Sequence, residues 1–278
     1  AQLKAEASNP RGDIWWGGTG DPHLQAAEEG LTQEYRSPRI NELHDWAQRQ
    51  WEQSKQRTVG VYAGALGYSF NTELLKKKGG AEPKCWADLT DARFRNDVQV
   101  ADPNASGTSY TMLATLVQIM GEAKAFDYLK ALHRNISQYT KSGAAPAAAA
   151  RSGESLVGIT FQHDAVVHAA QGAPLKVVSP CEGTGYEVGS MSIIKGARNL
   201  DNAKKWYDWA LSVEAQSIGP NSKVSYQVPS NKGAKAPAGA PDFATIKFIN
   251  YDFAKYGSSA ERTRLLQKWD KEVKVAPK

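Results

Sequence analysis

Apolar and polar positions follow one another in two different periods along the whole chain. Short apolar runs predict β-strands, whereas apolar residues three or four positions apart predict helices. The predicted strands cover residues 13–16, 58–70, 98–101, 155–161, 174–180 and 188–196. The predicted helices cover residues 21–30, 41–55, 109–120, 126–135, 143–154, 165–172, 200–212 and 259–269. Strands that alternate with helices of this length predict an α/β fold with mainly parallel sheets.

Four loops share one design, in which a strand runs into small polar residues at the start of a helix. They span residues 15–21, 101–109, 139–145 and 160–165. Ligands of open α/β sheets bind outside the carboxyl ends of the strands, and the free N–H groups of a helix N-terminus suit an anion. In the second loop, Gly107 would let a ligand approach the backbone, and three neighbouring hydroxyl residues would act as donors. This loop is predicted to cradle an anion, the alternative being a simple helix cap.

Composition excludes several classes of protein. With 41% hydrophobic and 23% charged residues among 278, the chain has the composition of a globular protein, and neither disorder nor a collagen-like fibre fits. No apolar run is long enough to span a membrane. The first residues do not resemble a secretory signal, which predicts a mature or trimmed form. The net charge is +5, with lysines and arginines scattered among acids, so nucleic-acid binding is not expected.

The sequence favours binding over catalysis. It has no Gly-x-Ser-x-Gly elbow, no phosphate-binding P-loop, no HExxH motif and no GxGxxG after a strand. His163 beside Asp164, with a remote serine, could imitate a hydrolytic triad, so a hydrolase of phosphate esters is the alternative of a different class. Adjacent residues on one loop seldom orient each other's side chains. No catalytic residue, metal ligand or cofactor is therefore predicted.

Cys85 and Cys181 are far apart in the sequence, and neither has a cysteine or histidine partner at the spacing of a zinc site. Two cysteines fit one disulfide of an oxidising compartment. They fit two buried free thiols equally well, and composition does not decide between these alternatives.

Several segments, in order along nearly the whole chain, carry a resemblance to a known family. They include "DIWWGGTGDPHLQAAEEGL", "GYSFNTELL", "ADPNASGTSY", "QYTKSGAAPAAAARSGE", "FQHDAV" and "CEGTGYEVGSMSIIKGARN". This series resembles the periplasmic substrate-binding proteins of ABC importers. The resemblance is to the type 2 branch, which contains ferric-ion, 2-aminoethylphosphonate and hexose-phosphate binders, and is closest to the hexose-phosphate binders.

The resemblance implies an architecture and a cellular role. It implies two α/β lobes joined by hinge strands, "GALGYSFN" and "YEVGSMSI", that close over a ligand in the cleft between the lobes. Lobe 1 would comprise residues 1–70 and 190–278, and lobe 2 residues 71–189. The protein would be periplasmic and would deliver its solute to an ABC permease in the inner membrane.

The resemblance also implies a ligand and a set of residues that bind it. The expected ligand is a small phosphorylated organic solute, a hexose phosphate, with its phosphate in the cradle of residues 106–109. His163, Asp164 and Glu187 resemble the hydroxyl-binding set of the hexose-phosphate members, with Glu182 as a competing candidate in the same segment. The complete candidate set is Thr19, Ser106, Gly107, Thr108, Ser109, Lys141, Ser142, Gly143, His163, Asp164 and Glu187.

Two other ligands stay open. A 2-aminoethylphosphonate ligand would suit the same loops, because a carboxylate facing its amine would serve equally well. Ferric binders of this branch commonly use adjacent tyrosines at the segment that here spans residues 222–233, and this chain offers only Tyr226 there. A hard cation also prefers a cluster of anionic oxygens, so ferric ion is the weaker alternative.

The chain departs from the family at its start. Family members normally begin with a strand, a helix and a second strand, so about forty residues are expected to be missing here. Either another chain supplies the missing strand, as in a dimer, or the sequence is a shortened form with a rearranged sheet; otherwise a monomer is expected. The lobe arrangement that the resemblance implies also places Cys85 and Cys181 where the chain enters and leaves lobe 2, so the resemblance implies a disulfide between them.

Overall fold

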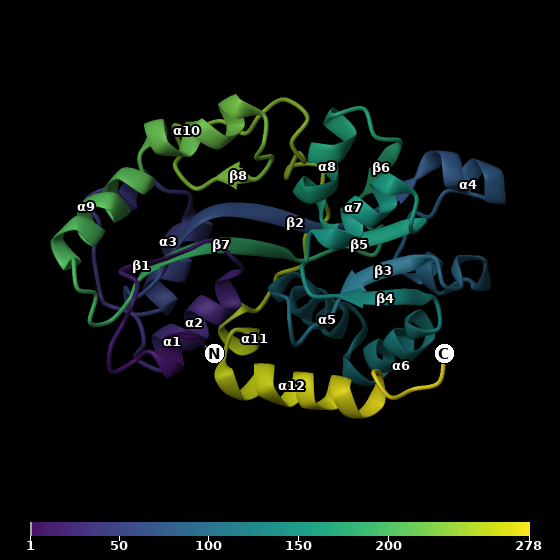
Figure 1. Ribbon diagram of the computed structural model, residues 1–278, viewed down its shortest axis with the longest axis horizontal. Helices are drawn as coiled ribbons and strands as arrows, with labels where there is room; N and C mark the ends of the chain where they lie inside the picture. Colours follow the sequence, from purple (N-terminus) through teal and green to yellow (C-terminus); the bar gives the residue numbers. More distant parts are fainter. Residues whose placement is uncertain (1) are drawn as a thin grey trace. The chain divides into compact units, whose positions relative to one another are not determined.

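The computed structural model describes residues 2–278, which form two compact units (Figure 1). The first unit comprises the chain up to Gly64 together with Glu187–Ala238 and Asp252–Arg262. The second unit comprises Ala65–Tyr186, Gly239–Tyr251 and Thr263–Lys278. Within the described part of the chain, no helix combines the length and the apolar character needed to cross a bilayer.

Two C-terminal segments belong to a different unit from the one that the sequence predicted. The sequence placed all of residues 190–278 in lobe 1, whereas residues 239–251 and 263–278 group with the second unit. Hydrogen bonds explain this grouping. Arg264 donates to both carboxylate oxygens of Glu122 at 2.9 and 2.7 Å, and the backbone N–H of Ile249 donates to the carbonyl of Thr184 at 2.9 Å.

The sheet of the first unit has the strand order β1-β7-β2, with β8 also paired to β2. Strand β1 (Ile14–Trp16) pairs antiparallel with β7 (Tyr186–Ile193), and β8 (Val228–Pro229) pairs antiparallel with β2 (Val59–Asn71). Both β2 and β7 continue into the second unit. Strand β1 lies at the edge of this order. Whether a further strand from another chain pairs with it stays a prediction.

The helices of the first unit are α1 (Gln2–Ala5), α2 (Gly20–Glu28), α3 (Asp45–Gln53), α9 (Leu200–Ala210), α10 (Val213–Ser222) and α11 (Phe253–Tyr256) (Figure 1). Of these, α3 and α9 contribute side chains to an apolar core. Trp51 of α3 and Tyr207 of α9 are buried in the core, together with Val61 and Met191 from the strands. The helical spacing of apolar residues in α3 therefore marked its buried face, as the sequence predicted.

The second unit contains a mixed sheet. Strands β3 (Val98–Ala101), β4 (Ile136–Thr140) and β5 (Val157–Phe161) are parallel, with β3 in the middle. Strand β2 pairs antiparallel with β5 and with β6 (Leu175–Val178). The prediction of mainly parallel sheets therefore needs correction, because helical crossovers connect only β3, β4 and β5, and β2 enters from the other unit in the opposite direction.

Helices cover both faces of the parallel strands. They are α4 (Thr72–Lys78), α5 (Gly107–Met120), α6 (Glu122–His133), α7 (Ala145–Ser152), α8 (Gln162–Ala170) and, from Thr263 onward, α12 (Ser259–Glu272). Figure 1 shows α5 and α6 on one face and α7 and α8 on the other. The alanine-rich segment forms α7 as predicted. A Cβ on Gly158 of β5 would lie 2.6 Å from the carbonyl carbon of Pro146, so α7 packs directly on the strand backbone.

Three details differ from the sequence prediction. Helix α2 begins at Gly20, one residue before the predicted start, with Thr19 as its N-cap residue, and the side chain of Asp21 is buried. Strand β4 was not predicted because its residues, "ISQYT", are largely polar. Helix α10 was not predicted because it contains Gly219 and Pro220, which usually interrupt helices.

Cys85 and Cys181 form the predicted disulfide, with their Cα atoms 4.7 Å apart. The backbone N–H of Cys181 donates to the carbonyl of Lys84 at 3.0 Å. The carboxylate of Glu182 accepts from the N–H groups of Trp86 and Ala87 at 2.8 and 2.9 Å. These contacts join the two ends of the long segment between the cysteines.

Removing the disulfide is expected to destabilise the second unit. Cys85→Ser combined with Cys181→Ser should lower its free energy of unfolding by about 2 to 4 kcal/mol, because the unfolded segment regains the freedom that the cross-link removes. Urea unfolding followed by circular dichroism would measure this loss. Dithiothreitol should shift the wild-type transition and leave that of the double variant unchanged; an equal transition for both proteins without reductant would contradict the expectation.

Candidate functional site

The N-terminus of α5 begins in a tight turn that follows β3. The N–H of Asn104 donates to Asp102 Oδ1 at 2.8 Å, and the N–H of Ser106 donates to the Asp102 carbonyl at 3.0 Å. Ser106 is the N-cap residue in extended conformation, yet its hydroxyl caps no N–H group of the helix. The first N–H groups of a helix have no intrahelical acceptor. The donors of residues 107–109 are therefore open to a ligand.

A second loop, which follows β4, lies against this helix start. Gly143 faces Ser106 and Thr108 so closely that an added Cβ would lie 2.7 Å from Thr108 Cβ and 2.8 Å from Ser106 Oγ. Only glycine permits this approach. The structure therefore brings together two of the predicted loops, and we call residues 106–109 with Gly143 the anion cradle. Lys141 and Ser142 are exposed beside Gly143.

Ser109 contributes a buried hydroxyl to the anion cradle. Its side chain is 1% exposed, and its Oγ has no hydrogen-bond partner in the protein. A buried hydroxyl without a partner costs about 1 to 3 kcal/mol. An oxygen atom of a bound anion would remove this cost.

Helix α8 places His163 and Asp164 in its first turn. The amide of Gln162 holds the helix start by donating to the Leu66 carbonyl at 3.1 Å and to Ser179 Oγ at 2.9 Å. The ring of His163 stacks on that of Phe161 with centroids 5.7 Å apart. Burial lowers the pKa of His163 to about 3 and raises the pKa of Asp164 to about 7. Neutral imidazole and a carboxyl near its titration midpoint can both donate and accept hydrogen bonds with hydroxyl groups.

The same pair lacks the geometry of a catalytic dyad. His163 Nε2 and Asp164 Oδ1 are 3.6 Å apart, which exceeds a normal hydrogen bond. A carboxyl that does not hydrogen-bond the imidazole cannot orient it as a triad requires. The arrangement suits recognition of a polar ligand better than nucleophilic attack.

Two candidates lie in the first unit. Thr19 is the N-cap residue of α2, and its hydroxyl is buried without a protein partner. Glu187 is the second residue of β7 and is 4% exposed. All other candidates belong to the second unit. Glu182, the competitor of Glu187, uses both carboxylate oxygens to bind the backbone N–H groups of Trp86 and Ala87 near the disulfide.

The residues present offer little for a metal ion. Among the described residues, the atoms that come together at metal-ligand spacing belong to Cys85, Cys181 and Glu182, but both sulfurs are in the disulfide. Disulfide sulfurs are not thiolate ligands. Tyr226 is buried in the first unit and is flanked in sequence by Ser225 and Gln227 rather than by a second tyrosine.

Sequence reasoning missed the residues that hold the anion cradle in place. The N–H of Asp102 donates to the Thr140 carbonyl at 2.8 Å, and the Thr140 hydroxyl donates to the Ser142 carbonyl at 2.8 Å. These bonds join the two loops of the anion cradle. The Asp-Pro-Asn order indicated the turn around Asp102. The pairing with Thr140 follows only from the parallel register of β3 and β4.

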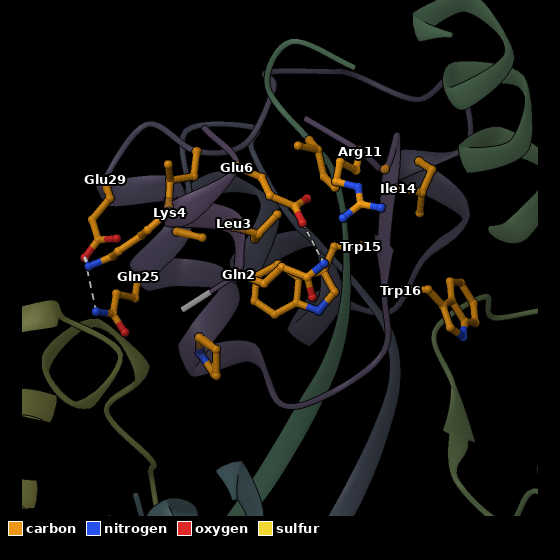
Figure 2. Close-up of a pocket in the computed structure, with 15 residues that line it drawn as sticks. Gln2, Leu3, Lys4, Glu6, Arg11, Ile14, Trp15, Trp16, Gln25 and Glu29 are labelled. Atoms are coloured by element: carbon orange, nitrogen blue, oxygen red, sulfur yellow. Dashed lines mark hydrogen bonds and ion pairs between the residues drawn. The ribbon is translucent and has the colours of Figure 1, made fainter. Parts of the chain in front are cut away.

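A large cavity elsewhere contains none of the candidate residues. It measures about 920 Å³ and lies in the first unit beside α1, β1 and α2 (Figure 2). Some of its polar side chains bind one another: Gln2 Nε2 donates to Glu6 at 2.9 Å, and Lys4 pairs with Glu29 at 2.7 Å. Because these donors already have partners, they would gain little from a ligand.

Comparison with known proteins gives a family match. Residues 19–256 match the family described as "Bacterial extracellular solute-binding protein". The structure of the periplasmic binding protein AfuA from Actinobacillus pleuropneumoniae, with exogenous fructose-6-phosphate bound, matches with a TM-score of 0.93 and 49% identity, covering 99% of this chain and 86% of that chain. The predicted periplasmic binding protein fold is thus confirmed.

Two relatives from sequence comparison extend this match. An uncharacterised protein of Haemophilus influenzae is 49% identical over 277 residues, which are 99% of this chain and 80% of the relative. A Salmonella typhi periplasmic protein, provisionally named for 2-aminoethylphosphonate binding, is 25% identical over 227 residues, which are 78% of this chain and 62% of the relative.

The raised pKa of Asp164 predicts a pH-dependent effect on stability. Because the pKa is about 7 in the folded state and 3.8 ordinarily, folding favours the protonated carboxyl, and this stabilisation is lost as pH rises from about 4 through 7. Asp164→Asn cannot ionise. The melting temperature of this variant relative to wild type should therefore be higher at pH 8 than at pH 4.

The matched control is Asp127→Asn, since the Asp127 side chain is 78% exposed in the same unit. Its melting temperature relative to wild type should change little between the two pH values. The effect of His163 is common to wild type and Asp164→Asn, so it cancels in their difference to first order. An Asp164→Asn difference that is the same at both pH values would show that Asp164 is not desolvated.

Proposed function

The chain belongs to the bacterial extracellular solute-binding protein family, and from this premise we propose that it captures a hexose phosphate in the periplasm for an ABC importer. The family assigns a binding role rather than an enzymatic one. Substrate-binding proteins of ABC importers work with an inner-membrane permease, which is the expected partner here. Relatives are named as periplasmic proteins, and a disulfide is typical of that oxidising compartment.

The observation that carries the proposal is the buried, unpartnered hydroxyl of Ser109 at the start of α5. Around it, the open N–H groups of the helix, the Ser106 and Thr108 hydroxyls and the close approach of Gly143 favour a ligand with several acceptor oxygens. A phosphate has that character, and the positive end of the helix dipole attracts it. Such a cradle needs no buried lysine.

The rest of the ligand is proposed to carry hydroxyl groups. The buried His163 and the half-buried Asp164 suit alternating donors and acceptors, and a sugar presents both. The fructose-6-phosphate bound to AfuA, at 49% identity, supports a hexose phosphate here. Thr19 and Glu187 are proposed as further ligand-binding residues of the first unit, and capture by hinge closure remains a prediction from the sequence.

A second candidate ligand is 2-aminoethylphosphonate. The Salmonella typhi relative and the half-buried Asp164 carboxyl favour it, because an ionised carboxylate would pair with the amine. The two ligands differ in whether they require Asp164 to be ionised. An amine requires the carboxylate, whereas a sugar hydroxyl binds either protonation state, so only the aminophosphonate should lose affinity in Asp164→Asn through loss of an ion pair.

A calorimetric panel tests the ligand class. Fructose-6-phosphate should bind wild type more tightly than fructose or inorganic phosphate, because only it can use the anion cradle and the polar residues of α8 together. It should be recovered unchanged after incubation, whereas release of phosphate would support a hydrolase. Tighter binding of 2-aminoethylphosphonate or Fe(III) would replace the hexose-phosphate assignment.

Ser109→Ala tests the anion cradle itself. Removing a hydrogen bond to a charged group should weaken fructose-6-phosphate binding by about 1.5 to 3 kcal/mol. The ligand-free protein should be as stable as wild type or more stable, since the variant loses an unsatisfied buried hydroxyl. Calorimetry and thermal unfolding would measure the two effects.

Ser69→Ala is the matched control. The Ser69 hydroxyl is likewise buried without a hydrogen-bond partner. Ser69 lies on β2 opposite Gly158, near the start of β5, whereas the candidate site lies at the other end of β5, beyond Phe161. This variant should gain similar stability and keep wild-type affinity. Equal affinities for Ser109→Ala and wild type would refute the role of Ser109.

A further inference from the structure

Asp102 lies at the junction of three parts of the second unit. Its backbone carbonyl accepts from Ser106 in the first loop of the anion cradle, and its backbone N–H donates to Thr140 before the second loop. Its side chain reaches the C-terminal end of the chain, where Lys274 Nζ donates to Asp102 Oδ2 at 3.0 Å. Asp102 therefore links both loops of the anion cradle to the segment after α12.

Neighbouring side chains complete this link. The amide of Asn104 donates to Asp270 Oδ1 of α12 at 2.9 Å and to Asp102 Oδ1 at 3.2 Å. Lys274 Nζ also lies 3.8 Å from Asp270 Oδ1. Asn104 and Lys274 thus each contact both Asp102 of the turn and Asp270 of α12.

We infer that Asp102 and Lys274, supported by Asn104 and Asp270, form a latch that positions the anion cradle for its ligand. These are positioning residues, which act on the turn before α5 rather than on the solute. The inference rests on the proposed function for its effect on affinity. Its structural part, the ordering of the turn before α5, is independent of the ligand.

The ion pair of Asp102 and Lys274 is expected to affect the turn before α5 more than the stability of the whole unit. The Lys274 side chain is 50% exposed and that of Asp102 is 21% exposed, and pairs of this kind contribute little to global stability. The turn is short, and its backbone sets the direction of the first N–H groups of α5. Small changes in that direction weaken several hydrogen bonds to an anion together, because each depends on alignment.

The charge states agree with a formed latch. Burial alone would raise the pKa of Asp102, but hydrogen bonds from Asn104 and Lys274 hold it below its ordinary value. The hydrogen bond to Asp102 raises the pKa of Lys274. Both groups are therefore charged at neutral pH, and the ion pair persists across the physiological range.

Two substitutions with opposite charge effects separate positioning from simple attraction. Lys274→Met removes a positive charge, and Asp102→Asn removes a negative one, yet both break the ion pair. Positioning predicts that both weaken fructose-6-phosphate binding, by about three- to ten-fold. Attraction of the anion by net charge alone predicts weaker binding for Lys274→Met and tighter binding for Asp102→Asn.

Two controls accompany these variants in calorimetry. Lys271→Met removes the same charge from an exposed position in the last turn of α12, and it should bind like wild type. Lys274→Arg retains a cation that can pair with Asp102 and should restore most of the affinity lost in Lys274→Met. Opposite affinity changes in Lys274→Met and Asp102→Asn, or wild-type affinity in both, would overturn the inference.

Hydrogen exchange of the ligand-free proteins tests the structural part. Amides of residues 104–110 should exchange faster in Lys274→Met than in wild type or Lys271→Met, with unchanged exchange in α9 of the first unit. Unchanged exchange at residues 104–110 would overturn the latch whether or not fructose-6-phosphate binds. If exchange increases but wild type shows no binding to fructose-6-phosphate, the proposed ligand fails and the latch stands as an ordering device for the turn.

Discussion

The parallel alignment of β3, β4 and β5 is the constraint on which the candidate site depends. Parallel neighbours cannot be joined by a tight turn, so the chain must cross over through helices. Helices α5, α7 and α8 therefore begin at the same edge of the sheet, where β3, β4 and β5 end. Unpaired N–H groups gather there as a consequence of topology. The absence of a side chain at Gly143 then allows the loop after β4 to approach Ser106 and Thr108 closely.

The site holds polar groups in a state that the ligand-free protein does not satisfy. The Ser109 hydroxyl is buried without a partner, and the Asp164 carboxyl is desolvated. Each feature lowers the stability of the free protein, and hydrogen bonds to the proposed solute would relieve it. A preorganised site of this kind binds more tightly than one whose groups are already paired, because fewer existing bonds must break. Binding and stability are thereby coupled in the second unit.

Contacts between distant parts of the sequence hold this preorganised state. The disulfide and the Glu182 carboxylate join the two ends of the segment between Cys85 and Cys181. At the opposite end of the sequence, Lys274 and Asp270 reach the turn that precedes α5. The final residues of the chain therefore support a loop that lies more than half the chain away from them in sequence. The second unit is complete only when these C-terminal residues are in place.

The sequence by itself determined the elements and the chemical character of the site. Apolar periodicity located most helices and strands, because burial of one face imposes that periodicity, and it failed for the polar strand β4 and for α10 with its internal proline. The Ser-Gly-Thr-Ser order was compatible with an anion cradle and with a simple helix cap, because small hydroxyl residues serve both roles at a helix start. Tertiary structure decided the partners. The approach of Gly143 to Thr108, the desolvation of Asp164 and the pairing of Lys274 with Asp102 depend on strand register and on helix packing, which local sequence does not encode.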